Sequence, residues 1–161
     1  MMQSIGAERH DRAHVREVME RLPLFDGYNG AELDTLSSYF RAFVAGAGTD
    51  IFAEGDAGAF LCVVVDGEVD VLKEDQQGVV RVVATVGAGK TLGEMALIDE
   101  EPRSAAARVT RAAQLLALSK DSFEAMMDGH PRLALQFMLT LGRLLSRRLR
   151  RTSGMLVDHL G

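Results

Sequence analysis

The chain has 161 residues and a formal net charge of −5 at neutral pH, with 47% apolar and 25% charged residues. This length predicts one domain, and the composition is that of an ordinary globular protein. The negative charge disfavours binding to nucleic acid or to an anionic membrane surface. The single cysteine, Cys62, lies in an apolar run. It cannot form an intrachain disulfide, and we expect it to be a core residue in a reducing compartment.

The first residues lack the apolar core of a signal peptide. No apolar run approaches the ~20 residues that a transmembrane helix needs. We therefore expect a cytoplasmic protein.

The N-terminal part of the chain has the apolar spacing of helices over residues 11–43, with a break at residues 22–27. Leu33, Leu36, Phe40 and Phe43 recur at helical intervals in the second half. Asn29 and Glu32 have the spacing of a capping box at its start. The pattern predicts two short helices.

Glycine and β-branched residues become frequent after residue 46. Short strands separated by glycine turns are typical of a sandwich or barrel. Asp66-Gly67 is a common sequence for a tight hairpin turn. The candidate strands are Thr49–Ala53, Phe60–Val65, Glu68–Leu72, Val79–Val86, Ala105–Val109 and Ala113–Ser119.

The C-terminal part returns to helical patterns. Asp121 or Ser122 can cap a short helix, and a longer helix is predicted over residues 132–152. The long helix has an apolar stripe on one face and is long for a chain of this size. We expect part of the stripe to face a second copy, giving a homodimer. The alternative is a helix packed wholly on its own barrel. The stripe consists of Met138, Leu141, Leu145, Leu149 and Thr152.

The most informative segment is 91–109, which contains Gly93-Glu94 and Arg103-Ser104. Glycine permits a close approach of a ligand to the main chain. The residues that follow can form one helical turn with unpaired amides, which favours an anion. Arg103 supplies a planar fork suited to phosphate, and Glu94 suits ribose hydroxyls. The segment predicts a site for a small phosphorylated ligand.

These residues resemble the phosphate-binding cassette of the cyclic nucleotide-binding domain family, whose pattern reads roughly Phe-Gly-Glu-apolar-Ala-Leu, a short gap, then Pro-Arg-Ser/Ala/Thr-Ala. The resemblance covers nearly the whole chain. It implies a mainly β fold, an eight-stranded jelly-roll barrel with flanking helices. The single domain would comprise N-terminal helices at 1–45, the barrel at 46–120 with its cassette at 91–109, and C-terminal helices at 121–161.

The resemblance also implies roles for individual residues. Glu94 would accept a hydrogen bond from the ribose 2′-hydroxyl, and Arg103 would pair with the cyclic phosphate. Gly93, Ser104 and the amides around Met95, Ala96 and Ala105 would complete the phosphate site. The sugar and base would be lined by Val71, Val83, Ala84 and Leu92.

The long helix is similar to that of catabolite-activator-like regulators. That similarity makes Arg148, Thr152 and Ser153 the base contacts, with one residue reaching across a dimer. The chain departs from the family pattern at Lys90, Thr91 and Leu92, where an acidic residue and aromatics are common. None of these departures removes a phosphate ligand.

The function that we expect is a stand-alone cyclic nucleotide receptor without catalytic activity. Cyclic AMP is the first choice because Thr152 and Ser153 can both donate to and accept from an adenine edge. Cyclic GMP is the second choice, through Ser104, and cyclic di-GMP fits a one-phosphate site less well. Binding would move the last helix and present it to an unidentified protein partner. Direct DNA binding is not expected, because only nine residues follow Thr152.

Three other interpretations stay open. The chain could be an interaction barrel that binds no nucleotide, or a sensor domain cut from a larger regulator. Jelly-roll barrels also include metal enzymes of the cupin type, which need histidines on barrel strands. We do not expect a metal site here, because all four histidines fall outside the predicted barrel: His10, His14, His130 and His159.

Overall fold

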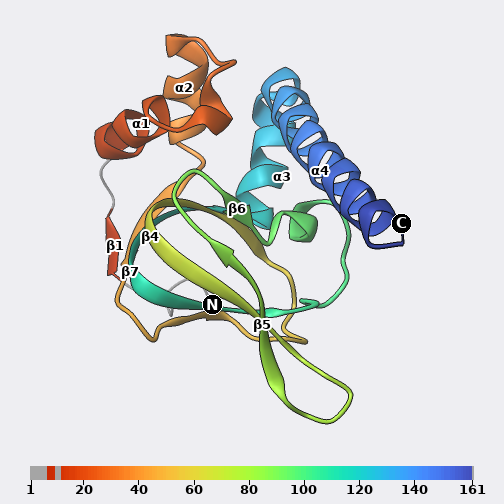
Figure 1. The fold of residues 1–161 in the computed structure, drawn as a ribbon. Coiled ribbons are helices and arrows are strands. Elements are labelled where there is room, and N and C mark those ends of the chain that lie inside the picture. The colour runs from red at the N-terminus through yellow and green to blue at the C-terminus, as the bar shows by residue number, and fades with distance from the viewer. Residues whose placement is uncertain (1–6, 10–11, 161) are drawn as a thin grey trace. The chain divides into compact units, whose positions relative to one another are not determined.

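The computed structural model describes residues 7–9 and 12–160 (Figure 1). His10 lies outside these residues. The chain divides into two compact units, the first reaching to Glu124 and the second beginning at Ala125.

The first unit begins with a short strand and two short helices, which Figure 1 shows together with the 3₁₀ turn between them. A capping box starts the second helix, as predicted: the Asn29 side chain accepts from the Glu32 amide, and the Glu32 carboxylate accepts from the Asn29 amide, both at 2.9 Å. The bounds are β1 Ala7–Arg9, α1 Arg12–Glu20, η2 Pro23–Phe25 and α2 Gly30–Ser37.

The helical interpretation of the last residues before 43 is wrong. The second helix ends at Ser37, and Arg41–Ala45 forms strand β2, which pairs with β1 on one side and β7 on the other. Strands β1 and β2 thus lie within the segment 1–45 that was expected to be helical. Phe40 and Phe43 are both buried, and strand pairing, not helical spacing, decides the backbone conformation of Phe43.

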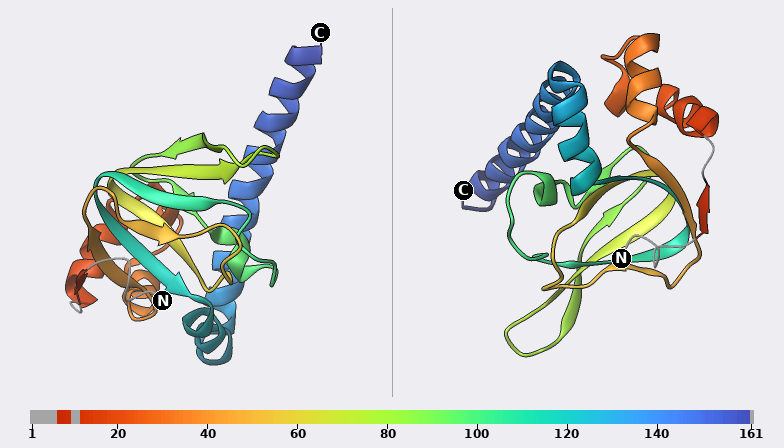
Figure 2. Two further views of the ribbon diagram at one scale, coloured as in Figure 1. Left: turned by 90° about the horizontal axis from the view of Figure 1, so that it is seen from below. Right: turned by 180° about the vertical axis from the view of Figure 1, so that it is seen from behind.

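The sheet of the first unit is antiparallel and has seven strands in the described residues, against the eight expected. Its two long strands are β4 and β7, which pair with each other over most of their length. Figure 1 and the right panel of Figure 2 show the β4–β5 hairpin projecting beyond the rest of the sheet. The remaining bounds are β3 Asp50–Phe52, β4 Phe60–Glu74, β5 Val80–Val86, β6 Thr91–Leu92 and β7 Ala106–Ser119.

The predicted strands Phe60–Val65 and Glu68–Leu72 are one strand, β4, because Asp66-Gly67 is not a hairpin turn. Gly67 has a φ of 93°, but the chain continues along β4 through a series of register shifts against β7. A Cβ at Gly67 would lie 2.4 Å from the carbonyl oxygen of Ala112. The glycine therefore allows a bulge and a close approach between two strands, so that two predicted strands become one.

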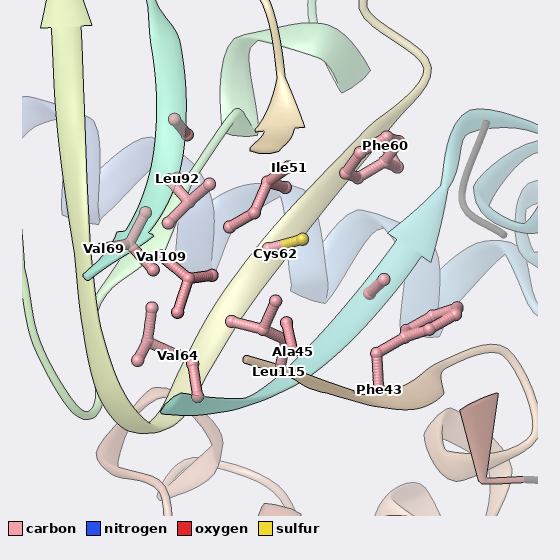
Figure 3. Close-up of a cluster of buried hydrophobic side chains, with 13 residues drawn as sticks. Phe43, Ala45, Ile51, Phe60, Cys62, Val64, Val69, Leu92, Val109 and Leu115 are labelled. Atoms are coloured by element: carbon pink, nitrogen blue, oxygen red, sulfur yellow. The ribbon is translucent and has the colours of Figure 1, made fainter. Parts of the chain in front are cut away.

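The barrel core is a cluster of aliphatic and aromatic side chains from β2, β3, β4, β6 and β7 (Figure 3). Cys62 lies in the middle of it, beside Ile51 and Leu92. This confirms that the thiol is a core group. The centroid of the Phe52 ring at the end of β3 lies 6.2 Å from that of the Phe60 ring at the start of β4, and a Cβ on Gly93, just after β6, would lie 3.1 Å from the Phe60 carbonyl oxygen, so these three strand ends lie close together.

The second unit contains most of the C-terminal helices. Helix α3 runs over Lys120–Gly129 and α4 over Pro131–Leu160, so the long helix extends beyond the predicted residue 152 and includes Met155–Val157. The buried residues of α4 all lie in its first half, and every residue from Gly142 to Leu160 is at least partly exposed. Among the residues that the structure describes, no helix combines the length and the apolarity that crossing a bilayer requires.

Candidate ligand-binding site

The predicted cassette begins where strand β6 ends. Gly93 follows Leu92 in the left-handed conformation, with φ 74° and ψ 14°. The 3₁₀ turn η3, Glu94–Leu97, comes next, and the Ala96 amide donates to the Gly93 carbonyl at 3.1 Å. The predicted turn after Gly93 is therefore confirmed. A residue with a side chain would be strained at this backbone conformation, which explains the glycine.

The Arg103 side chain folds back onto this turn and is only 7% exposed. Its Nη1 donates to the Gly93 carbonyl at 3.1 Å, and its Nη2 donates to the Phe60 carbonyl. A Cβ on Gly93 would lie 2.4 Å from Nη1, so the guanidinium occupies the space that the glycine leaves open. Within the described part of the chain, the buried Nε has no hydrogen-bond partner.

The electrostatic surroundings of Arg103 are unusual for a buried cation. Burial lowers the pKa of its guanidinium, and the nearby carboxylates of Asp56 and Glu94 act in the opposite direction. The Cys62 thiol is also close, but burial raises its pKa to about 12, so it is neutral at pH 7. The side-chain hydrogen bonds of the guanidinium thus go to neutral carbonyl oxygens, and the two carboxylates act on it through their charge. A site of this kind favours an anion.

The main chain of Arg103 is held by the loop between β3 and β4. The Arg103 amide donates to the Asp56 carbonyl at 2.7 Å, and the Gly55 amide donates to the Arg103 carbonyl at 2.8 Å. A bridge between Ala57 and Pro102 continues this pairing. These bonds fix the backbone from which the guanidinium extends.

Glu94 is also buried, with 7% of its surface exposed, and its charge acts on Arg103. Ser104 is exposed, and its carbonyl accepts a 2.7 Å hydrogen bond from Lys73 Nζ. The structure therefore brings Gly93, Glu94 and Arg103 together at the start of η3.

The remaining predicted contacts of the first unit differ in exposure. Val71 is half-buried and pairs with Ala84 across β4 and β5, whereas Leu92 is buried in the barrel core. Val83 falls at a register shift and is 58% exposed. In the cassette, Met95 is exposed, Ala96 is buried and Ala105 is half-buried. Their contacts with a ligand stay predictions.

The predicted base contacts lie in the second unit. Thr152 and Ser153 are exposed on α4, Arg148 is half-buried, and the Thr152 hydroxyl donates to the Arg148 carbonyl at 3.0 Å. Their role as base contacts stays a prediction.

Sequence reasoning missed the aromatic neighbours of Arg103. The guanidinium carbon lies 4.0 Å from the ring centroid of Phe52 and 5.0 Å from that of Phe60. Both phenylalanines stand in apolar strands, where an aromatic residue indicates only a core position. The sequence carries no local signal that links them to an arginine more than 40 residues away.

The comparisons with known proteins agree with this geometry. The family model described as cyclic nucleotide-binding domain matches residues 43–130. The chain is 37% identical over 132 residues to the cyclic AMP receptor protein of Thermus thermophilus, an alignment that covers 82% of this chain and 59% of that protein. It is 30% identical over 122 residues to the cAMP-dependent protein kinase regulatory subunit of Yarrowia lipolytica, covering 73% and 32%.

Solved structures show the same similarity. A cyclic nucleotide-binding domain from Methylobacillus flagellatus matches with a TM-score of 0.78 and 28% identity, covering 91% of this chain and 83% of that one. The catabolite activator protein of Thermus thermophilus matches with a TM-score of 0.71 and 36% identity, covering 83% and 61%. The chain spans about three fifths of the length of the first curated relatives it matches.

The resemblance read from the cassette and the expected fold class, mainly β with flanking helices, are thus both confirmed. The matched residues include both long strands, the turn at Gly93 and the buried Arg103. On these grounds the chain is a member of the cyclic nucleotide-binding domain family.

Proposed function

We propose that this chain binds a cyclic mononucleotide, with cyclic AMP preferred over cyclic GMP, and acts as a regulatory module rather than an enzyme. Arg103 pairs with the cyclic phosphate, and Glu94 accepts from the ribose 2′-hydroxyl. Ser104 and the amides near Met95 complete the phosphate site. Base contacts come from Arg148, Thr152 and Ser153 of α4.

One observation carries the proposal. A buried guanidinium lies against a left-handed glycine, donates to carbonyl oxygens, and keeps a buried Nε without a hydrogen-bond partner among the described residues. A buried N–H donor without an acceptor is costly, and a bound phosphate oxygen would supply that acceptor. The names of the relatives in Thermus thermophilus and Yarrowia lipolytica, which mention cyclic AMP, support the choice of ligand.

Titration calorimetry with cyclic AMP and cyclic GMP tests this function. We expect saturable binding with the larger affinity for cyclic AMP. Arg103→Leu should weaken binding by a factor of roughly 30 to several thousand, because removing one member of a buried charge pair costs ~2–5 kcal/mol. Ligand at 100 times Kd should also stabilise the fold by ~2.7 kcal/mol in thermal unfolding. No heat and no stabilisation at millimolar ligand would refute the proposal.

A second candidate function is an interaction barrel that binds no nucleotide. It is favoured by the two hydrogen bonds that Arg103 already makes to the main chain at Gly93 and Phe60. On this alternative the arginine links the turn at Gly93 to β4. Arg103→Leu would then lower the stability of the fold, and neither the original protein nor the variant would bind nucleotide. The same calorimetry and unfolding measurements distinguish the two functions.

Signalling in this proposal passes through α4. Ligand binding shifts the helix between two arrangements, and dimerisation through its exposed half offers the altered surface to a protein partner. The second half of the helix, from Gly142 to Leu160, supports this role because its residues are exposed or partly exposed.

A further inference from the structure

The segment Phe52–Phe60, here called the Arg103 clasp, holds both the main chain and the side chain of Arg103. In the middle of this segment, the Asp56 carbonyl accepts from the Arg103 amide, and the Gly55 amide donates to the Arg103 carbonyl. Its two ends are phenylalanines, the last residue of β3 and the first residue of β4. The segment that joins β3 to β4 therefore contacts Arg103 both at its main chain and at its guanidinium.

The two rings lie close to the guanidinium and to each other. The Arg103 Cζ is 4.0 Å from the Phe52 centroid and 5.0 Å from the Phe60 centroid, both within the ~6 Å range of a cation–π interaction. The ring centroids are 6.2 Å apart and their planes are inclined at 67°. Phe60 is buried and also supplies the carbonyl that accepts from Nη2.

Such surroundings suit arginine in particular. A guanidinium is planar and weakly hydrated, so aromatic faces can replace part of its hydration, whereas an ammonium would lose more. The carbonyls of Gly93 and Phe60 use one donor each on Nη1 and Nη2. Three of the five N–H donors of the guanidinium are then left for a ligand.

We infer that Phe52 and Phe60 are positioning residues: their rings fix the orientation of the Arg103 guanidinium before the ligand arrives. This inference rests on the proposed function for its effect on affinity. A fork held in advance loses little freedom on binding a phosphate, and a mobile one loses more. The rings thereby set the affinity for the anionic part of the ligand without touching it.

The first experiment measures cyclic AMP affinity by calorimetry in the folded 161-residue chain. Phe52→Leu and Phe60→Leu should each weaken binding about three- to tenfold, the range of one cation–π interaction. Phe52→Tyr keeps an aromatic ring at this position, and its affinity for cyclic AMP should lie within about twofold of that of the original protein. In an Arg103→Leu background, Phe52→Leu should have no further effect on the residual affinity.

Phe43→Leu is the matched control, because Phe43 is a buried phenylalanine of the same barrel core. It should lower stability and leave the affinity of the folded protein unchanged. Equal affinity losses in Phe43→Leu and Phe52→Leu would overturn the inference, since general loosening of the core would then explain both. Unchanged affinity in both ring variants would overturn it as well.

A second experiment needs no nucleotide and separates failure of the inference from failure of the proposed function. A double-mutant cycle of Phe52→Leu and Arg103→Leu is measured by urea unfolding of the free protein. We expect the two changes to be coupled, with a factor of about three to ten in the folding equilibrium. If Arg103→Leu does not fold, Arg103→Met, an unbranched apolar replacement, takes its place in the cycle.

Additive effects in this cycle would show that the rings do not act on the guanidinium, whether or not the protein binds nucleotide. If the two changes are coupled but the original protein binds no nucleotide, the contact between the rings and the guanidinium is supported and the proposed function is refuted. The two results are independent.

Discussion

Gly93 and Arg103 depend on each other at the level of single atoms. The left-handed backbone of Gly93 turns its carbonyl toward Nη1, and the missing Cβ leaves the space that Nη1 occupies. The sequence pattern predicted both residues to be part of one phosphate site, since their spacing is local. It did not indicate that the arginine rests on the glycine, because that contact depends on the path of the intervening loop.

Cys62 gives a prediction at the same scale. Burial raises the pKa of its thiol from 9.0 to about 12, and the nearby Arg103 charge lowers it only in part. The folded state keeps this proton while the unfolded thiol ionises above pH 9. The free energy of unfolding should therefore fall between pH 9 and 12, by about 1.4 kcal/mol per pH unit from this group.

Urea unfolding at pH 8 and pH 10.5 measures this effect, with Cys62→Ala as the control that lacks the thiol. Other groups titrate in both proteins, so the difference between their slopes isolates Cys62. Identical pH dependence in the two proteins would contradict a thiol buried in the barrel core.

At the scale of elements, the irregularity of β4 at Gly67 separates the part of the strand that pairs with β6 from the part that pairs with β5. The strand passes from its pairing with β6 to its pairing with β5 on either side of this residue, while β7 pairs with it throughout. The Asp-Gly pair signals a positive φ, which the structure has. Whether such a residue closes a hairpin or bulges a continuous strand depends on the partner strand, and no local pattern contains that partner.

We expect Gly67→Ala to destabilise the protein by ~3 kcal/mol or more, because the new Cβ would be both strained in φ and 2.4 Å from the Ala112 carbonyl oxygen. Gly48→Ala is a matched control: its φ is 89°, but a Cβ there meets nothing within 4 Å. It should cost only ~1–2 kcal/mol. Equal costs in urea unfolding would show that the close strand approach contributes nothing.

At the scale of the whole molecule, the second half of α4 exposes apolar side chains that a partner could cover. Leu149 and Leu156 are 67% and 60% exposed, and they lie one heptad apart, on the face that carries Leu145 and Thr152. Apolar residues at this spacing are typical of a helix that packs against another helix. The sequence stripe predicted a dimer on the same grounds, and the dimer stays a prediction.

Light scattering over a range of concentrations tests the dimer. We expect the original protein to be dimeric and the Leu149→Glu, Leu156→Glu double variant to be monomeric, because two buried carboxylates would lack partners. Arg147→Glu is the control, since a residue two positions from Leu149 points to the other side of the helix. A monomeric original protein, or a double variant that stays dimeric, would contradict the assignment of this surface.

The sequence by itself determined the family, the turn after Gly93 and the helix start marked by the Asn29 capping box. These features depend on residues close together in the chain, where spacing defines geometry. Tertiary structure alone decided that β4 continues past Gly67, that residues 41–45 form a strand, and that Phe52 and Phe60 enclose Arg103. Each of these depends on contact between distant segments, and an apolar residue in a strand pattern does not reveal which neighbour it will meet.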